Sequence, residues 1–293
     1  MPEGHTIHHL AARFRAAFGG GRPVRVDSPQ GRFAEGAARL DGLPLTATEA
    51  HGKHLFLGFG DPAVTGWVHI HLGLYGKVAF GSGAAPAPVG QVRLRLAGAE
   101  GYAELRGPNT CALVTEEERL ALAARLGPDP LRPDADPERA WRRIAAARTG
   151  VAALLMEQKV IAGVGNVYRA EVLFRQHIDP HLPGRALGRP AWEAVWADLV
   201  TLMREGARHN RIDTVRPEHT PEAMGRPPRV DGHGGEVYVY RRAGQPCLVC
   251  GTTVRTAVLA ARNLFWCPRC QPPQAGAAGP GTRPGNRTSA GSC

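Results

Sequence analysis

Two pairs of cysteines near the C-terminus constrain the fold of this chain more than any other feature. Each pair has the spacing C-x2-C, as Cys247-Leu-Val-Cys250 and Cys267-Pro-Arg-Cys270, and sixteen residues separate the pairs. Four thiolates at this spacing bind one zinc ion in a tetrahedral site that leaves no position open for catalysis. The sequence therefore predicts a single structural zinc ion (Zn2+) at the tip of a β-hairpin, in a segment too short to have a core of its own.

Hydrophobic periodicity predicts a β-rich N-terminal half. Residues 4–18 place apolar side chains at helical spacing and predict one amphipathic helix. Short runs separated by Gly, Pro or Asp follow, and they predict strands at 53–59, 67–72, 76–80, 91–96 and 102–106. Short strands with tight turns indicate an antiparallel β-sandwich or barrel, with a flexible loop at 81–90.

From about residue 115 the period becomes helical. Thr115-Glu-Glu-Glu118 has the spacing of a capping box, and Asp136-Pro137 supplies an N-cap followed by a proline at the first helical position. Further helices are predicted at 150–159, 166–176 and 190–209. The fold class is therefore α+β multidomain, a β-sandwich with flanking helices, then a helical domain, then a zinc ribbon. The predicted segments are a sandwich domain at 1–128, a helical domain at 129–224, a zinc-finger segment at 225–271 and a disordered tail at 272–293.

The formal net charge of +10 indicates attraction to polyanions such as nucleic acid, although an anionic membrane or no specific partner would fit the charge equally well. Only three of the 36 basic residues are lysines, namely Lys53, Lys77 and Lys159. No apolar run approaches the ~20 residues that span a bilayer, and the N-terminus lacks a signal-peptide core. We therefore expect a soluble cytoplasmic protein.

The segment Gly163-Val-Gly165-Asn166 is a second candidate site. Its glycines permit a tight turn, and Asn166 can cap the helix that follows. The N–H groups at that helix start would form an anion pocket suited to a backbone phosphate. An ordinary helix–turn–helix with a well-formed cap is the alternative interpretation.

Pro2 and Glu3 are a third candidate site. Removal of Met1 would leave Pro2 with a secondary amine, and an α-amino group has a pKa near 8. Attack of this amine on a sugar C1′ gives a cationic iminium, which drives elimination of the flanking phosphates. The Glu3 carboxylate is placed to shuttle protons. Many proteins begin with Met-Pro-Glu, so the pattern alone does not identify an enzyme.

Histidines are numerous, and they are interpreted conservatively. We expect His5, His8 and His9 at surface or cap positions of the first helix. His69 and His71 lie two apart on a predicted strand, hence on one face, and they are expected to be structural or DNA-facing.

Taken in order, these motifs resemble the formamidopyrimidine-DNA glycosylase / endonuclease VIII family, and the resemblance runs from Pro2 to Gln271. It implies a bifunctional DNA glycosylase and AP lyase in base excision repair. Such an enzyme excises oxidised bases through a proline Schiff base and then carries out β/δ-elimination.

The resemblance also assigns roles to individual residues. Pro2 is similar to the family's nucleophile and Glu3 to its proton donor and acceptor. Lys53 resembles the strand lysine that contacts DNA near the lesion and assists catalysis, a role suited to a compact ammonium. Asn166 resembles the asparagine of the helix–two-turn–helix that grips phosphate. Arg262 resembles the zinc-finger arginine that binds a phosphate at the lesion.

Lesion preference rests on two loops. Leu74 and Tyr75 resemble the wedge of the endonuclease VIII branch, which fills the gap left by a flipped base. The Asp-Pro-Arg-Arg-Phe-Gly loop of the guanine-specific branch is absent. The corresponding stretch is Glu104-Leu-Arg106-Gly-Pro-Asn-Thr110, where Arg106 is the candidate second inserting residue. This favours the endonuclease VIII-like branch and oxidised pyrimidines or a broad range of lesions. A guanine-directed glycosylase is the alternative.

The expected partner is double-stranded DNA with oxidised bases or abasic sites, bound across a cleft between two domains. We expect a monomer associated with a bacterial nucleoid, without membrane contact and with zinc as its cofactor. Two other interpretations stay open. One is a non-catalytic damaged-DNA-binding protein on the same scaffold, and the other is a zinc-ribbon RNA-binding or scaffold protein.

Overall fold

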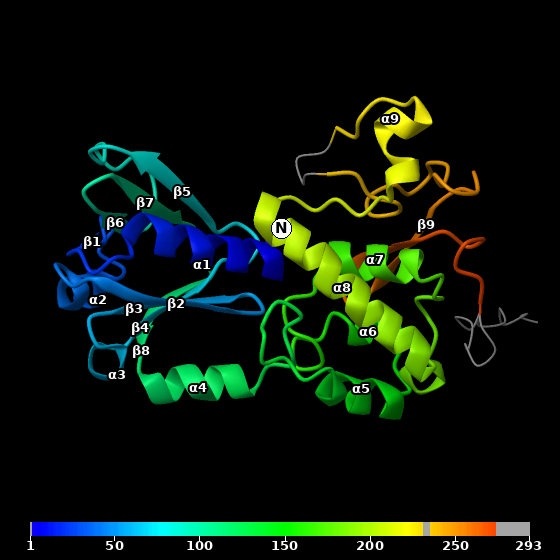
Figure 1. The fold of residues 1–293 in the computed structure, drawn as a ribbon, viewed down its shortest axis with the longest axis horizontal. Coiled ribbons are helices and arrows are strands. Elements are labelled where there is room, and N and C mark those ends of the chain that lie inside the picture. The colour runs from blue at the N-terminus through cyan, green and yellow to red at the C-terminus, as the bar shows by residue number, and fades with distance from the viewer. Residues whose placement is uncertain (1, 231–234, 274–293) are drawn as a thin grey trace, which may run out of the picture.

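Two lobes lie side by side in the computed structural model, which describes residues 2–230 and 235–273 (Figure 1). The N-terminal lobe, blue to cyan, contains two β-sheets and helix α1. The C-terminal lobe, green to orange, contains most of its secondary structure as helices and also a β-hairpin. The N-terminal end of the chain lies between the lobes.

The N-terminal lobe is an antiparallel sandwich, as predicted. One sheet has the order β1 (Arg25–Asp27), β6 (Val92–Ala97), β7 (Gly101–Arg106), β5 (Lys77–Ser82). The other has the order β2 (Leu45–His51), β3 (His54–Phe59), β4 (Trp67–His71), β8 (Thr110–Val114). Helix α1 (Gly4–Phe18) buries Ile7, Leu10 and Phe14 in the core shared with both sheets. Its apolar spacing thus predicted both the helix and its buried face.

Five predicted strands correspond to β3 through β7, but β1, β2 and β8 were missed, as were the short helices α2 (Ala34–Leu40) and α3 (Pro62–Thr65). Strand β2 contains two threonines, a glutamate and a histidine, so its sequence shows little apolar alternation. Strand β8 is half-buried along its whole length, which also removes the alternation that identifies a strand.

The helix caps predicted after the β-rich half are present. Thr115 and Glu118 form both hydrogen bonds of a capping box at the start of α4 (Glu116–Ala124). Asp136 caps α5 (Pro137–Ala146) by accepting from the backbone N–H of Glu138. These short polar motifs identify helix starts because they satisfy N–H groups that the helix itself leaves unpaired.

The predicted helix at 150–159 is shorter than expected, because α6 (Val151–Leu154) ends after one turn. Beyond it the Gln158 side chain donates to the Val164 carbonyl and accepts from the Gly163 N–H, so it stabilises a loop in place of further helix. The predicted helices at 166–176 and 190–209 correspond to α7 (Asn166–Arg175) and α8 (Arg189–His209).

The helices of the C-terminal lobe and the cysteine-rich segment share one hydrophobic core. It includes Tyr168 of α7, Trp192 of α8, and Leu264 and Phe265 of the hairpin formed by β9 (Arg255–Leu259) and β10 (Arg262–Trp266). The domain boundaries after residues 128 and 224 stay predictions. The predicted disordered tail falls, from residue 274 onward, outside the described residues.

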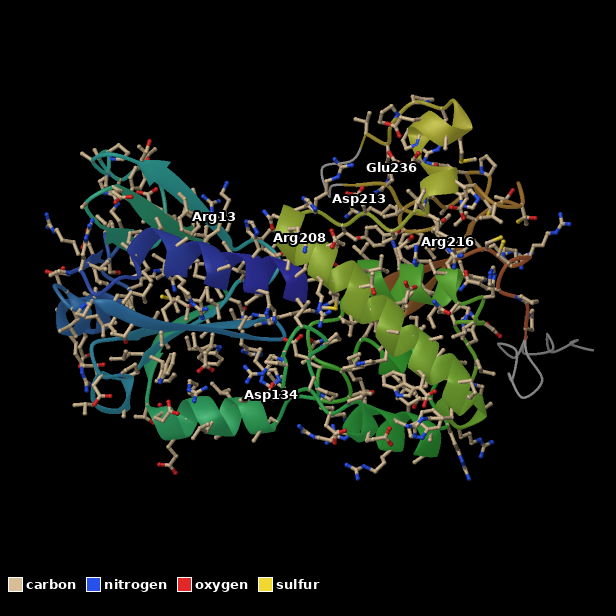
Figure 2. All side chains as sticks on the ribbon, viewed as in Figure 1. Arg13, Asp134, Arg208, Asp213, Arg216 and Glu236 are labelled. Atoms are coloured by element: carbon tan, nitrogen blue, oxygen red, sulfur yellow. The ribbon has the colours of Figure 1, made fainter. Side chains whose placement is uncertain are left out.

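The irregular segment before the cysteines is anchored on α7. The buried carboxylate of Glu171 accepts the backbone N–H groups of Tyr238, Val239 and Tyr240 at 2.7, 2.9 and 2.8 Å. The N–H of Glu236 also donates to Asp213, and Figure 2 shows these two residues close together beside α9 (Pro221–Met224). Side-chain carboxylates thus replace the hydrogen bonds that a strand or helix would supply here.

Two short 3-10 helices, η1 (Gly184–Ala186) and η2 (Pro217–His219), complete the regular structure of the described residues. None of the helices in residues 2–230 and 235–273 combines the length and the apolar character needed to cross a membrane.

Candidate active site and zinc centre

Three backbone segments meet between the lobes at Gly4, Gly52 and Gly163. The Gly4 N–H donates to the Gly163 carbonyl at 2.8 Å. A Cβ on Gly4 would lie 2.8 Å from the Gly163 Cα, and one on Gly52 would lie 3.0 Å from the Gly163 backbone nitrogen. Because no side chain separates them, the start of the chain, the β2–β3 turn and the loop before α7 are in direct contact. Glu3 and Lys53 thereby reach the N-terminus of α7.

The fully buried Glu3 carboxylate occupies the N-terminus of α7. It accepts the N–H groups of Gly165, Val167 and Tyr168 at 2.9, 2.8 and 3.4 Å. The prediction that these N–H groups form a phosphate pocket is therefore wrong, because the protein's own carboxylate is their anion. The prediction that Asn166 caps the helix is also wrong, since Asn166 is its first residue and Gly165 is the N-cap.

Glu3 and Lys53 form an electrostatically coupled pair. Burial raises the pKa of Glu3, while Lys53 and the three backbone N–H groups oppose the rise. Burial also lowers the pKa of Lys53, with Glu3 opposing and Arg262 reinforcing the change. The Lys53 ammonium donates to the Val164 carbonyl at 3.0 Å. Both pKa values are thus shifted in the direction of neutral pH, which favours proton exchange by each group.

Pro2 lies directly before Glu3 in the chain and is half-buried. Glu3 has an extended backbone, and the Gly4 N–H donates a hydrogen bond to the Gly163 carbonyl. Together they fix the start of the chain against the C-terminal lobe. The backbone therefore holds Pro2 next to Glu3, whose carboxylate is electrostatically coupled to Lys53.

Asn166 and Arg262 approach the same region from α7 and from the hairpin. The Asn166 side-chain amide donates to the Asn263 carbonyl at 3.0 Å, and its Oδ1 is buried without a partner among the described residues. Arg262 is the first residue of β10, at the tip of the hairpin, and it is exposed. Its charge lowers the pKa of Lys53, so the two cations are close in space.

The residues predicted to fill the duplex lie on a loop and a strand end of the N-terminal lobe. Leu74 and Tyr75 project from the β4–β5 loop with 53% and 86% of their surface exposed. Arg106 at the end of β7 instead forms an ion pair with Glu104 and donates to the Val89 carbonyl. Leu74 and Tyr75 are available at a loop tip, whereas Arg106 contacts its own sheet and the loop beside it.

Sequence reasoning missed the polar contacts that join the lobes. The buried Asp129 accepts from the Gly52 N–H at 2.7 Å and contacts His8 Nε2 at 2.8 Å. His9 contacts the Ala207 carbonyl at 2.9 Å, and His5 is buried edge-on against Tyr168. The prediction of surface or cap positions for these histidines is therefore wrong, because their helix lies along the other lobe. Each contact joins residues far apart in sequence, so no local spacing indicates it.

His69 and His71 do share one strand, and both belong to a larger group. His69 stacks on His54 with 2.9 Å between Nε2 and Nδ1 of the two rings, and His54 also contacts the ring of His71. Burial, followed by the neighbouring histidines, lowers the pKa of His54 to about 3. The group is therefore neutral at physiological pH.

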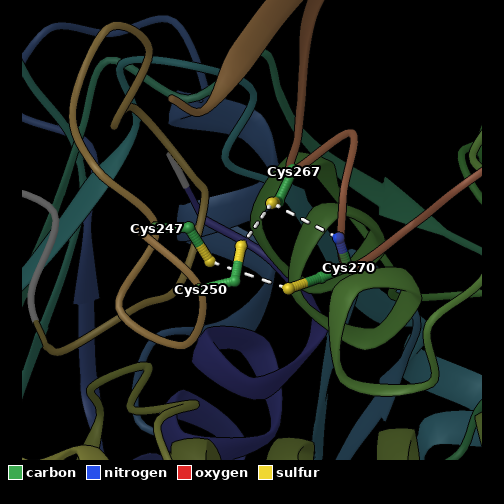
Figure 3. A group of neighbouring side chains, drawn as sticks. All are labelled: Cys247, Cys250, Cys267 and Cys270. Atoms are coloured by element: carbon green, nitrogen blue, oxygen red, sulfur yellow. Dashed lines mark hydrogen bonds between the residues drawn. The ribbon is translucent and has the colours of Figure 1, made fainter. Parts of the chain in front are cut away.

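The four cysteines converge as the sequence predicts (Figure 3). Their sulphur atoms all lie within 4.8 Å of one another, with 3.9 Å between Cys247 and Cys270 and 3.5 Å between Cys250 and Cys267. Four sulphurs about 2.3 Å from one zinc ion would lie about 3.8 Å apart, so the set fits a tetrahedral site. The expected position was wrong in one respect. The cysteines flank β9 and β10 at the open end of the hairpin, because Ala260 and Ala261 form its tip.

Three family models match successive parts of the chain. The formamidopyrimidine-DNA glycosylase N-terminal domain matches residues 1–110, and the formamidopyrimidine-DNA glycosylase H2TH domain matches 126–216. The zinc finger found in FPG and IleRS matches residues 244–273.

Curated relatives match over nearly the whole length. The chain is 52% identical over 279 residues to Endonuclease 8 1 of Mycobacterium tuberculosis, covering 92% of this chain and 100% of the relative. It is 36% identical over 301 residues to the probable endonuclease 8 2 of Streptomyces coelicolor, covering 98% of each. It is 33% identical over 273 residues to DNA-(apurinic or apyrimidinic site) lyase Nei2 of Mycolicibacterium smegmatis, covering 92% of this chain and 99% of the relative.

Solved structures share the fold. MutM in complex with DNA containing carbocyclic 8-oxo-G has a TM-score of 0.73 at 20% identity, covering 93% of this chain and 100% of that one. Lactococcus lactis Fpg bound to DNA with an abasic site also has a TM-score of 0.73 at 20% identity, covering 92% and 100%.

The sandwich lobe, the H2TH helices and the four-cysteine ribbon define the class as two-lobed zinc-ribbon proteins of the DNA-glycosylase type. Within that class, this chain belongs to the formamidopyrimidine-DNA glycosylase / endonuclease VIII family, in its endonuclease VIII-like branch.

Proposed function

We propose that this protein is a bifunctional DNA glycosylase and AP lyase that excises oxidised bases from double-stranded DNA in base excision repair. The observation that carries the proposal is the meeting of Glu3 and Lys53 at the start of α7, with Pro2 directly before Glu3 in the chain. The relatives named as endonuclease 8 and as an AP lyase support the same activity, since they match over almost the whole chain.

The proposed reaction begins when loss of Met1 exposes the secondary amine of Pro2. Its nitrogen lone pair forms a bond to C1′ of the damaged nucleotide, the glycosidic bond breaks, and the base leaves with the bonding electrons and takes up a proton. Loss of the amine proton and opening of the sugar ring give a cationic iminium between Pro2 and C1′. Glu3 and Lys53 are the groups proposed to move these protons.

The lyase step follows from the iminium. Removal of a C2′ proton sends electrons toward the cationic nitrogen, and the C3′–O bond breaks with loss of the 3′ phosphate. A second elimination breaks the C5′–O bond in the same way, and water then releases the sugar fragment from Pro2. We propose Glu3 as the group that exchanges the C2′ proton, because its raised pKa suits both uptake and release.

We propose that Asn166 and Arg262 bind backbone phosphates, and that Leu74 and Tyr75 fill the gap left by the flipped nucleotide. Flipping costs a few kcal/mol and least for damaged pairs, so an exposed apolar wedge favours selection of lesions. Arg106 would have to leave Glu104 to insert into the duplex. The wedge and the endonuclease 8 relatives favour oxidised pyrimidines or a broad lesion range over guanine lesions.

The zinc ion, held by the four cysteines, supplies structure and takes no part in the reaction. It would hold the open end of the β9–β10 hairpin, whose tip carries Arg262. We further propose that the protein acts as a monomer on chromosomal DNA, in the cytoplasm of a bacterium and associated with its nucleoid. Solved relatives bound to lesion-containing and abasic DNA support this partner.

Borohydride trapping on a duplex with one abasic site tests the assignment of Pro2. The iminium should be reduced to a stable protein–DNA adduct, and mass spectrometry should place the DNA on residue 2. Pro2→Gly is a partial control because glycine still has an amine, so chemical blocking of the N-terminus is the stronger one. An adduct that blocking leaves unchanged would exclude Pro2. Specific binding to abasic duplex without any adduct would favour a non-catalytic binding protein.

A further inference from the structure

Arg169 is a fully buried cation that the reaction described above does not use. It lies on α7, three residues after Asn166 and therefore on the same helix face. Its guanidinium donates to the Ala152 carbonyl at 3.3 Å and the Asn263 carbonyl at 3.4 Å, and its Nε is buried with no hydrogen-bond partner in the described part of the chain. Within residues 2–230 and 235–273 it forms no ion pair with a carboxylate.

Burying a charge in this way is costly unless it is paired. The same helix shows the usual arrangement at Arg175, whose Nε and Nη2 both contact the Asp198 carboxylate at 2.7 Å. Arg175 also donates to a backbone carbonyl, so the main difference is that Arg169 lacks a carboxylate partner among the residues that the structure describes. Arg169 therefore requires an explanation beyond packing.

The Asn263 carbonyl connects Arg169 with Arg262. In the hairpin, Arg262 pairs with Leu259 next to the turn and Asn263 pairs with Val258. Alternate pairs of an antiparallel ladder turn their backbone groups outward, which leaves the Asn263 carbonyl available to α7. Asn166 and Arg169 both donate to it. Helix α7 thus holds β10 one residue after Arg262.

The charges around this contact are mostly of one sign. Burial, and then the nearby Arg262, lower the pKa of Arg169 to about 10, so Arg169 stays charged at neutral pH. Arg262 also acts on Lys53, so three cations from the β2–β3 turn, α7 and β10 lie close together. Glu3 acts on both Lys53 and Arg169, but its carboxylate is bound to the start of α7. An anion placed among these cations would relieve their repulsion.

We propose that Arg169 is a positioning residue for Arg262, holding the Asn263 carbonyl so that the Arg262 guanidinium meets a phosphodiester group of bound DNA. Arg169 is fully buried and touches no DNA itself. The inference rests on the proposed function for its ligand, a phosphodiester next to the lesion, but it concerns binding and not turnover.

The test measures the Kd for a duplex containing a tetrahydrofuran abasic analogue over a series of KCl concentrations. Each phosphate neutralised contributes about 0.9 to the slope of log K against log salt. We expect Arg169→Met to weaken binding by about tenfold and to reduce the slope by about 0.9, although no DNA-contacting residue has changed. Arg169→Lys, which keeps the charge on a shorter donor, should restore part of the affinity.

Arg175→Met is the matched control, since it removes a second arginine from the same helix. It should lower the thermal midpoint and leave the salt slope unchanged. Arg262→Gln completes a double-mutant cycle. If Arg169 acts through Arg262, then Arg169→Met will have little further effect on Kd in the Arg262→Gln background.

An unchanged slope in folded, zinc-loaded Arg169→Met, or effects of Arg169→Met and Arg262→Gln that multiply, would overturn the positioning role. If Arg169→Met does not fold, the salt slope of Arg169→Lys decides: the positioning role predicts a slope below the wild-type value, because the shorter ammonium holds the Asn263 carbonyl less well, and a wild-type slope would overturn the role. Failure of the wild-type protein to form a borohydride adduct would count against the proposed reaction alone, because these binding measurements need no turnover.

Discussion

Two opposing effects act on the ionisation of the Glu3 carboxylate. Its charged form is stabilised by three N–H groups at the start of α7, as expected of an anion at a helix N-terminus. Its burial favours the neutral form and raises the pKa. The same side chain therefore holds two lobes together and stays able to take up a proton.

The proposed proton transfer by Glu3 leads to a prediction for Glu3→Gln. An amide cannot transfer the proton, so single-turnover base release should fall by a factor of 10² or more, the usual contribution of general acid–base catalysis. The Kd for duplex with a tetrahydrofuran analogue should change far less, because no proposed phosphate contact is lost. Base release at the wild-type rate would show that Glu3 serves the structure alone.

Leu74 and Tyr75 allow a sharper separation of function from stability. Both are exposed, so Leu74→Ala with Tyr75→Ala should change the free energy of unfolding by less than about 0.5 kcal/mol. Excision from duplex DNA should fall at least tenfold, whereas excision from single-stranded DNA should not, since a single strand has no gap to fill.

Leu120→Ala on α4 is the matched control, because Leu120 and Leu74 both have 53% of their surface exposed. It should leave excision from either substrate unchanged. An equal loss on duplex and single strand in the Leu74 and Tyr75 variant would contradict a wedge.

Residues with a local signature could be found from sequence, and residues defined by a distant partner could not. The four cysteines converge as their spacing predicts. Asp129 and Arg169 carry no such signal, because their importance comes from His8, Gly52 and Asn263, which are distant in the chain. The prediction that a phosphate binds the N-terminus of α7 was wrong for the same reason, since Glu3, which binds there, lies 162 residues from Gly165.

Among the elements, the β9–β10 hairpin has unusual turn chemistry. Ala260 and Ala261 both have positive φ angles, +50° and +59°. A two-residue turn of this kind favours Asn-Gly, and an alanine in the left-handed region costs roughly 1–2 kcal/mol. The hairpin that carries Arg262 therefore contains a strained tip.

Replacing Ala260→Asn and Ala261→Gly should relieve this strain. We expect a gain of about 1 kcal/mol in the local stability of the hairpin, which corresponds to about fivefold slower amide hydrogen exchange in β9 and β10. Ala257→Gly within β9 is the comparison, because glycine in a strand should speed the same exchange. Faster exchange in the turn variant would mean that the two alanines are not strained.

Elements were predictable where side-chain pattern and capping chemistry agreed. Helix α1, with one apolar face, and helices α4 and α5, with polar caps, were found. Strands β2 and β8 were missed because neighbouring strands, and not their own alternation, fix them in the sheet. Helix α6 was predicted too long because Gln158 stabilises the loop that follows it.

On the scale of the whole molecule, polar contacts join the two lobes while each lobe keeps its own apolar core. Asp129 lies at the centre of these contacts. Burial alone would raise its pKa, but His8 and the N–H groups of Leu131 and Gly52 lower it overall. Its charged form is thus favoured in the folded protein, and the stability it contributes is present above the unfolded pKa of 3.8.

Asp129→Asn should therefore destabilise the protein by about 3 kcal/mol at pH 7. The difference from wild type should shrink as pH falls from about 4 through the lowered pKa of Asp129, because protonation removes the same charge. Urea unfolding at pH 7 and at pH 3.5 measures both values. A difference that does not change with pH would show that the charge of Asp129 does not stabilise the contact between the lobes.

The close contact of Gly4, Gly52 and Gly163 limits how the protein can be tagged. Gly4 is packed against Gly163 and Glu3 is fully buried, so the amino end enters the molecular interior within three residues. An affinity tag or fusion partner ahead of Pro2 would convert the amine to an amide and would need an exit path between the lobes. Purification handles therefore belong at the carboxyl end, and a leader peptide has to be cut back to the proline itself.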